Sequence, residues 1–165
     1  MSKKPLNQTA PENETEAAPA KKQRRGKEAV KAALINAAGE LLAEIGPKAM
    51  SVRDVAVRAG VNHGQVHHYF NGKDGLIKTA MRALAKEHME HAKERADGGS
   101  IPPPLTLRND PLYVRAVVRL VMDGELEMAT MEIEDGVSVP RMVFDALLES
   151  QPGPEASVDF KAFLA

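Results

Sequence analysis

The sequence predicts an all-α protein. Through most of the 165 residues, apolar side chains recur at steps of three and four, the spacing of one face of a helix. No segment alternates apolar and polar residues as a half-buried strand does, and glycine or proline separates the periodic stretches, where helices end. The expected architecture is an N-terminal three-helix helix-turn-helix unit, a linking helix and a short helical C-terminal domain.

The first segment, residues 1–20, contains almost nothing to bury, so we expect a disordered tail. Five basic residues follow it: Lys21, Lys22, Arg24, Arg25 and Lys27. They form either a solvated segment or an arm that follows the phosphates, or reaches the minor groove, of a nucleic acid. The apolar positions from Lys27 to Ile45 then predict an amphipathic helix of about five turns. Gly46 and Pro47 close this helix.

Two short helices across a tight turn are predicted next. Ser51 is a good N-cap, and Asp54 three residues later completes a capping box. Gly60 ends the first helix, because only a residue without a Cβ sits comfortably in the left-handed C′ conformation. Asn62 starts the second helix, with Gln65 as the partner in a second capping box. Such a pair is a helix-turn-helix, whose second helix enters the major groove of DNA.

The next helix is expected to link this unit to the rest of the chain. Asp74 caps it, it extends to about Arg95, and the three prolines in residues 97–105 end it, so we place a domain boundary there. Asp110 and Pro111 are the N-cap and first residue of another helix. That helix is apolar nearly all round, so we expect it to be buried.

The remainder of the chain is less regular. Residues 123–138 are acidic and poorly periodic, and no helix is predicted there. Residues 139–148 predict a shorter helix, and a last helix begins near Ala156.

The net charge of −1 is unevenly distributed. Residues 21–95 hold fifteen Lys and Arg against eight Asp and Glu, whereas residues 96–165 hold five against twelve, so only the first block suits a polyanion. The absence of cysteine excludes disulfides and thiolate metal sites. No apolar run approaches the roughly 18 residues of a membrane span, and no apolar segment follows the N-terminal lysines as in a secretory signal. We therefore expect a cytoplasmic protein without membrane association.

The segment AGVNHGQVHHYFNGKDGLI, residues 59–77, resembles the signature of the TetR/AcrR family of transcriptional repressors. That signature has Ala-Gly-Val-Ser, then Tyr-x-x-Phe, then x-x-Lys-x-x-Leu. The positions that match it are Gly60, Val61, Phe70, Lys73 and Leu76. His67 stands where tyrosine is usual, and its imidazole still donates to a phosphate or a base edge, with a different response to pH.

The resemblance covers about residues 25–90. It implies a TetR-type DNA-binding domain at residues 21–95, with its motif at residues 51–70. It also implies a helical ligand-binding or dimerisation domain at residues 105–165, which is short or truncated for such a domain.

The recognition helix has an inward and an outward side, separable at 100° per residue. Val66 and Phe70 face the core. The outward side consists of Gly64 and His68, flanked by Gln65 and His67. The start of such a helix normally meets base edges, so the candidates for base readout are His63, Gly64 and Gln65. Gln65 has two candidate uses, pairing with adenine or closing the capping box.

Further DNA contacts follow from the resemblance. Arg53, in the first turn of the preceding helix, matches a position that often reaches a base, and guanine is its natural partner. Without a recognition helix it would simply be a solvated arginine. Lys73 is implied to clamp a phosphate, with Ser51 and Tyr69 as further phosphate donors. Such contacts position the protein without reading sequence.

The histidines also raise a metal hypothesis. His63 and His67 have the i,i+4 spacing of two zinc ligands, but the glutamate of a catalytic zinc motif and a third ligand are missing. His88 and His91 form a weaker pair, which we expect to continue the apolar stripe of the linking helix. We therefore expect no metal, no cofactor and no enzymatic activity.

The leading interpretation is a homodimeric repressor that reads a palindromic operator in double-stranded DNA and is released by an unidentified small-molecule effector. The homodimer requires that the C-terminal helices suffice to form it. One alternative is a DNA-binding module without effector control, truncated or dependent on a partner protein. A remote alternative is a metal-dependent enzyme built on the histidines. A monomer in solution favours the first alternative, and stoichiometric zinc favours the second.

Overall fold

The protein is described from a computed structural model, which covers residues 18–99, 102 and 106–150. Every regular element in these ranges is a helix, which confirms the predicted all-α class. In chain order the elements are α1 (Ala18–Ala49), α2 (Val52–Ala59), α3 (Gly64–Phe70), α4 (Lys73–Arg95), the 3-10 turn η1 (Thr106–Asn109), α5 (Pro111–Met122), α6 (Leu126–Glu134) and α7 (Val139–Ser150).

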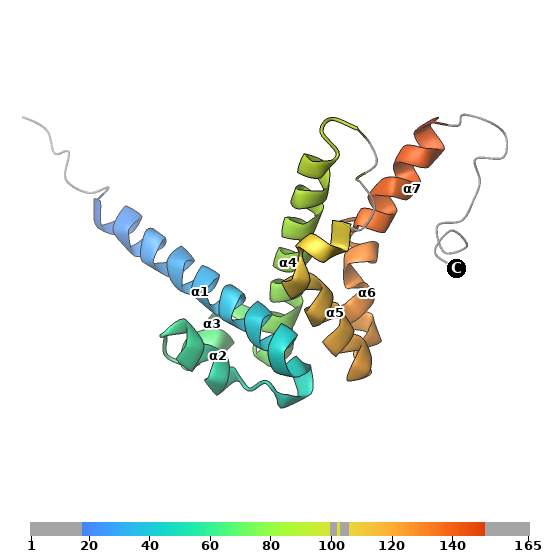
Figure 1. The fold of residues 1–165 in the computed structure, drawn as a ribbon. Coiled ribbons are helices and arrows are strands. Elements are labelled where there is room, and N and C mark those ends of the chain that lie inside the picture. Colours follow the sequence, from blue (N-terminus) through green and yellow to red (C-terminus); the bar gives the residue numbers. More distant parts are fainter. Residues whose placement is uncertain (1–17, 100–101, 103–105, 151–165) are drawn as a thin grey trace, which may run out of the picture.

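Helix α1 is the element around which the others are arranged. It packs against α2, α4 and α5, while α3 packs against α4, and α6 against α4 and α5 (Figure 1). The short helices α2 and α3 lie at one end of the molecule and α7 lies at the other (Figure 1). The helix-turn-helix is therefore presented at an end of the protein rather than enclosed by it.

A single apolar core runs through helices α1 to α6. Leu34 and Leu42 of α1, Val66 of α3 and Leu76 of α4 are fully buried, and the same cluster contains Leu120 of α5. Full burial of one such side chain stabilises the fold by about 1.5–3 kcal/mol. The core thus includes residues from both sides of the proline-rich segment where we predicted a domain boundary.

Helix α1 begins earlier than its apolar pattern predicts. It starts at Ala18, so residues 18–20 of the expected tail are helical, because the segment is rich in Ala, Lys, Gln and Arg, which favour helices. Pro19 lies in the first turn, where a missing N–H is tolerated. The prediction for its other end is confirmed: Gly46 has φ 81° and ψ 169°, which breaks the helix at that residue.

The C-terminal half differs from expectation in two ways. Helix α5 is not buried all round, since Val118, Val121 and Met122 are 52%, 48% and 78% exposed. Helix α6 lies within the acidic segment for which no helix was predicted, and only Ala129 of it is buried. Helix α7 agrees with the prediction for residues 139–148, and the helix expected near Ala156 lies outside the described residues.

Polar contacts fix α5 to the end of α1. The Arg119 Nη2 donates to the carbonyl of Glu44 at 2.9 Å, and the Lys48 N–H donates to the Asp123 carboxylate at 3.0 Å. Helix α5 is thus tied to the helix that supports the DNA-binding motif. None of the helices in the described ranges is long and apolar enough to cross a membrane.

Candidate nucleic-acid interface

The first helix of the motif starts as predicted. The Ser51 Oγ accepts the Asp54 N–H at 3.1 Å, and the Asp54 carboxylate accepts the Ser51 N–H at 3.1 Å, so the capping box is confirmed. The Ser51 hydroxyl also donates to Asp54 at 2.6 Å, and this hydrogen bond lowers the pKa of the Asp54 carboxyl. To donate to a phosphate, as predicted, Ser51 must give up this hydroxyl bond.

The turn also agrees with the sequence. Gly60 adopts φ 68° and ψ 32°, the left-handed conformation predicted for it. The N–H of Val61 reaches back to the Ala56 carbonyl at 3.0 Å, which closes the helix in the manner of a Schellman motif.

The start of α3 differs from the prediction, because the second capping box does not form. Asn62 Oδ1 accepts the Gly64 N–H at 2.9 Å, two residues on, which is a bond that asparagine favours at turns. The Gln65 side chain does not complete the box: its Oε1 is buried and has no hydrogen-bond partner among the described residues. The capping use of Gln65 is therefore wrong.

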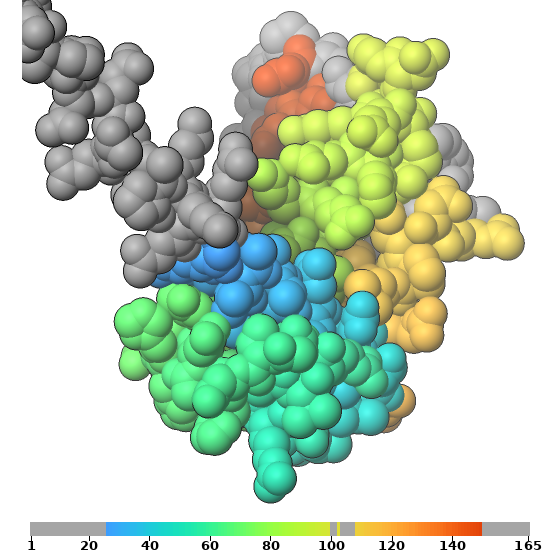
Figure 2. All heavy atoms as spheres, turned by 90° about the vertical axis from the view of Figure 1, so that its left-hand side faces the viewer, coloured from blue at the N-terminus to red at the C-terminus, as the bar shows by residue number. Residues whose placement is uncertain are grey.

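The two sides of α3 are arranged as the 100° rule predicts. Val66 is fully buried and Phe70 packs against the core. The exposed residues are His63, Gly64, His67 and His68, while Gln65 and Tyr69 are half-buried. The exposed residues of α3 thus form one accessible edge. Helices α2 and α3 lie in the lower part of the space-filling view (Figure 2).

Two lysines of α1 lie beside the recognition helix, and sequence reasoning did not place them there. Lys27 Nζ lies 5.6 Å and Lys31 Nζ 5.7 Å from the centre of the Tyr69 ring. Cations within about 6 Å of a ring are attracted to it. The i,i+4 spacing of these lysines on the polar side of α1 was the available signal. They add positive charge next to the predicted phosphate donor Tyr69.

Lys73 begins α4 directly after a tight turn. Asn71 and Gly72 have φ 58° and 105°, and a Cβ at Gly75 would lie 1.8 Å from the Phe70 carbonyl oxygen. Only glycine fits at position 75, so the backbone of α4 lies against the end of the recognition helix. Lys73 is half-buried and forms no ion pair within the described ranges.

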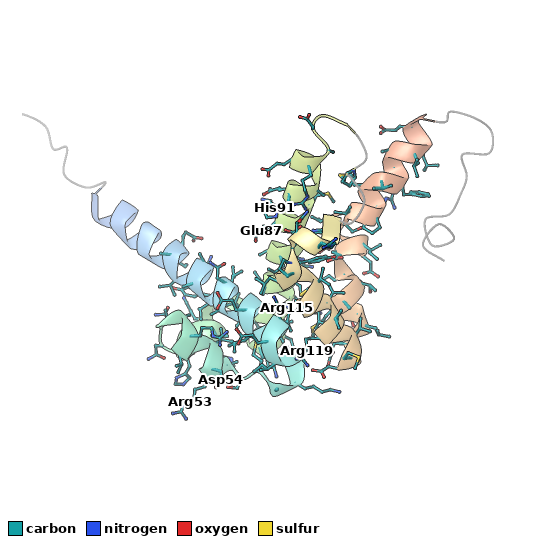
Figure 3. The ribbon with its side chains drawn as sticks, in the orientation of Figure 1. Arg53, Asp54, Glu87, His91, Arg115 and Arg119 are labelled. Carbon is teal, nitrogen blue, oxygen red and sulfur yellow. The ribbon has the colours of Figure 1, made fainter. Side chains whose placement is uncertain are left out.

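The two arginines of α2 have different surroundings. Arg58 pairs with Glu44 at 2.8 Å and with Glu40 at 3.7 Å, which fixes α2 to α1. Arg53 is exposed and lies at the outer edge of the motif (Figure 3). Its position suits the predicted contact with a base.

The histidines do not gather into a metal centre. Among the described residues there is no group of three or more His, Cys, Asp or Glu that could hold a metal ion. His88 is buried on α4, as expected, but both it and His91 bind Asp110 through Nδ1.

A helix-turn-helix that packs on a long first helix and continues into a linking helix defines a class of DNA-binding domain. Residues 34–80, from α1 into α4, match the profile of the bacterial regulatory proteins of the tetR family. Over this segment the chain is similar to the DNA-binding domain of the TetR family, as its motif suggested.

Two curated relatives of this segment are named as HTH-type transcriptional regulators. The chain is 35% identical over 99 residues to the HTH-type transcriptional repressor Rv3405c of Mycobacterium tuberculosis, covering 60% of this chain and 50% of the relative. It is 36% identical over 95 residues to the HTH-type transcriptional regulator BetI of Stenotrophomonas maltophilia, covering 57% and 42%. The chain spans about half the length of the curated relatives it matches. No solved structure matches it.

Proposed function

We propose that this protein is a sequence-specific, DNA-binding transcriptional regulator. The observation that carries the proposal is the placement of α3, which is held on the core by Val66 and leaves a polar edge accessible. That is the geometry a recognition helix needs to enter a major groove. The match to HTH-type regulators across this region supports the same conclusion.

Each predicted contact has a role in this proposal. His63, Gly64 and Gln65 read base edges from the start of α3, and Arg53 reads a guanine from α2. Gln65 does not cap the helix, and it must turn its buried Oε1 outward to pair with adenine. The remaining contacts position the protein on phosphates and involve Ser51, His67, His68, Tyr69 and Lys73.

The proposed regulator acts as a homodimer on a palindromic operator, because two equal recognition helices read two equal half-sites. We propose repression as its effect, since one relative is named a repressor. A small molecule that binds the operator-free form more tightly would lower the affinity for DNA through a coupling free energy. A lasting monomer in solution would favour the module without effector control.

Selection of bound fragments from random DNA tests the proposal. We expect enrichment of a palindrome whose half-sites are about one helical turn apart, or a multiple of it. Fluorescence anisotropy with the enriched duplex and a scrambled duplex then measures the ratio of the two affinities. No enrichment, or equal affinity for both duplexes at physiological salt, would overturn the proposed function.

A further inference from the structure

Two adjoining cavities lie between α1, α4 and α5, away from the DNA-binding motif. Their volumes are about 200 and 210 Å³. Both are lined by Leu84 and Glu87 of α4 and by Leu112 of α5. The shared lining makes them two lobes of one site, which we call the α1–α4–α5 site. Figure 3 shows Glu87 and His91 one turn apart on α4, beside the 3-10 turn.

One end of this site is organised by a buried carboxylate. Asp110 accepts hydrogen bonds from His88 Nδ1 at 2.7 Å, His91 Nδ1 at 2.6 Å and Arg95 Nη2 at 2.8 Å. Burial opposes ionisation of Asp110, but these three hydrogen bonds outweigh it and lower the pKa of the carboxyl. An ionised carboxylate can only accept hydrogen bonds, so both imidazoles that bind Asp110 carry a proton on Nδ1.

This arrangement fixes what the imidazoles present to the site. When a ring is neutral and its Nδ1 holds the proton, Nε2 is a hydrogen-bond acceptor. His88 and His91 both line the site, and His88 is also held by stacking on Tyr113, with ring centres 4.5 Å apart. When both rings are neutral, their Nε2 atoms are thus available as hydrogen-bond acceptors for a ligand.

The charge of the lining has one sign. Three carboxylates and two imidazoles line the site, and neither lysine nor arginine is among its lining residues in the described part of the chain. Asp110 is satisfied by its three donors, and Glu40 lies 3.7 Å from Arg58. Glu87 has no ion pair among the described residues that would compensate its charge. Apolar walls complete the site, including Ile35, Ala80, Leu84 and Leu112.

We propose that the α1–α4–α5 site binds a small organic cation, a primary ammonium or amidinium group on an apolar body. The N–H donors of such a group match the acceptors on Glu87 and the neutral imidazoles, and its body fits the apolar walls. A metal ion needs three or more converging ligands, which the described residues do not supply.

The position of the site suggests that the bound cation regulates DNA binding. This inference rests on the proposed function. Helix α4 supplies Glu87, His88 and His91 to the lining, and it begins at Lys73, next to the recognition helix. A cation between α1 and α4 therefore contacts both helices that hold the motif, which is where an effector has to act.

Benzylammonium serves as the probe, with neutral benzyl alcohol and anionic benzoate as matched controls. Titrations of the full chain at pH 8 are followed by the imidazole nitrogen shifts of His88 and His91. We expect benzylammonium to shift both rings, and Glu87→Gln to weaken it about tenfold, the effect of losing one charge-assisted hydrogen bond. Glu90→Gln is the control variant, because Glu90 lies on α4 outside the site and faces Lys86. It should change the affinity less than about twofold.

The pH dependence of cation binding provides a second test. His91 faces Asp110 at the start of α5, and Glu87 and Arg95 on its own helix. The hydrogen bond to Asp110 is the main cause that raises the pKa of His91. A protonated His91 repels the cation, so binding should weaken as the pH falls from 8 to 6.

Equal binding of benzyl alcohol or benzoate, an unchanged affinity in Glu87→Gln, or no imidazole shift with benzylammonium would each overturn the cation site. Binding of the selected DNA duplex by the same preparation without amine separates the two proposals. A protein that binds DNA but not benzylammonium refutes the cation site alone. A protein that binds benzylammonium but no specific DNA refutes the proposed function alone.

Discussion

Lys73 and Arg53 differ in what they should contribute to DNA binding. We expect Lys73→Ala to weaken binding to all sequences and to reduce the slope of log affinity against log salt by about 1, because one phosphate contact is lost. Arg53→Ala should instead cost about 1–3 kcal/mol at one base pair of the preferred site.

Anisotropy titrations at several salt concentrations, with single-base variants of the selected duplex, measure both effects. Arg58→Ala is the comparison, since Arg58 is paired with Glu44 and Glu40 and should act through stability rather than DNA contact. A loss of specificity from Lys73→Ala, or a uniform loss from Arg53→Ala, would contradict the assigned roles.

Gly75 is the residue at which the backbone tolerates no side chain. A Cβ would lie 1.8 Å from the Phe70 carbonyl oxygen, so Gly75→Ala must displace α4 or the end of α3. We expect it to lower the free energy of unfolding by about 3 kcal/mol or more, at the upper end of overpacking costs. Urea denaturation measures the change.

Gly26→Ala is the matched control, because a Cβ there meets nothing within 4 Å. It lies inside α1, so alanine should stabilise the helix by up to about 1 kcal/mol. Similar destabilisation by both substitutions would show that the close approach at Gly75 is not the cause.

Asp110 links the stability of the fold to pH. Its pKa is lowered, so its contribution is present above its ordinary value of about 4 and is lost as the pH falls through the folded value. The pKa of His91 is raised, so its contribution is complete below its ordinary value of about 6.5 and is lost as the pH rises through the folded value. The pair should therefore stabilise the protein most between about pH 4 and 6.5.

Asp110→Asn should cost about 3 kcal/mol near pH 5, as expected for breaking a buried charged network, and should flatten both limbs of the pH profile. Urea denaturation from pH 3 to 9 measures this. Asp97→Asn, an exposed change beyond the end of α4, is the control. An unaltered profile in Asp110→Asn would refute the role of the network.

At the scale of elements, α2 depends on its capping box. Ser51→Ala should cost about 1 kcal/mol, because it removes the acceptor for the Asp54 N–H. Asp54→Ala should cost a similar amount, and the double substitution should cost less than their sum, since both remove the same box. Thermal unfolding of the three variants measures the coupling, and strict additivity would mean that the box acts as two separate bonds.

The motif was predictable from sequence because its signals are local. Ser51, Asp54 and Gly60 act within four residues of the backbone groups they bind, so their roles follow from spacing alone. The second capping box, with Gln65, was predicted wrongly because its signal is also local. Asn62 accepts the nearer Gly64 N–H instead, and residue spacing does not show which of two local hydrogen bonds forms. The position of Lys27 and Lys31 beside Tyr69 depends on how α1 packs against α3, and residue spacing carries no information about that packing.

The C-terminal helices were harder to predict because their burial depends on contacts with other helices, which the local sequence does not show. Helix α6 uses a narrow apolar side, with Met128 and Met131 against the core, within an acidic segment. Helix α5 has apolar residues nearly all round. Tyr113, Ala116 and Leu120 are buried, whereas Val118, Val121 and Met122 remain exposed. Hydropathy shows which residues can be buried but not which side finds a partner.

At the scale of the whole molecule, the continuous core predicts cooperative unfolding. Leu120 of α5 is fully buried in the same cluster as Leu34 of α1, so Leu120→Ala should cost about 2–5 kcal/mol. The loss should appear equally in probes of both halves, as one transition by calorimetry. Val118→Ala on the exposed side of α5 is the control. Two separate transitions would show that the halves unfold independently.

The attachment of α5 to α1 has a consequence for anyone who builds hybrid sensors from this protein. The proline-rich segment suggests a fusion point near residue 98. A fusion protein that ends there would lack α5 and would expose the apolar side of α1 that α5 covers. We expect such a protein to aggregate. A junction placed after Asp123 would carry α5 and its bonds to Glu44 and Lys48 into the hybrid. The segment to transfer is therefore about twenty-five residues longer than one that ends near residue 98.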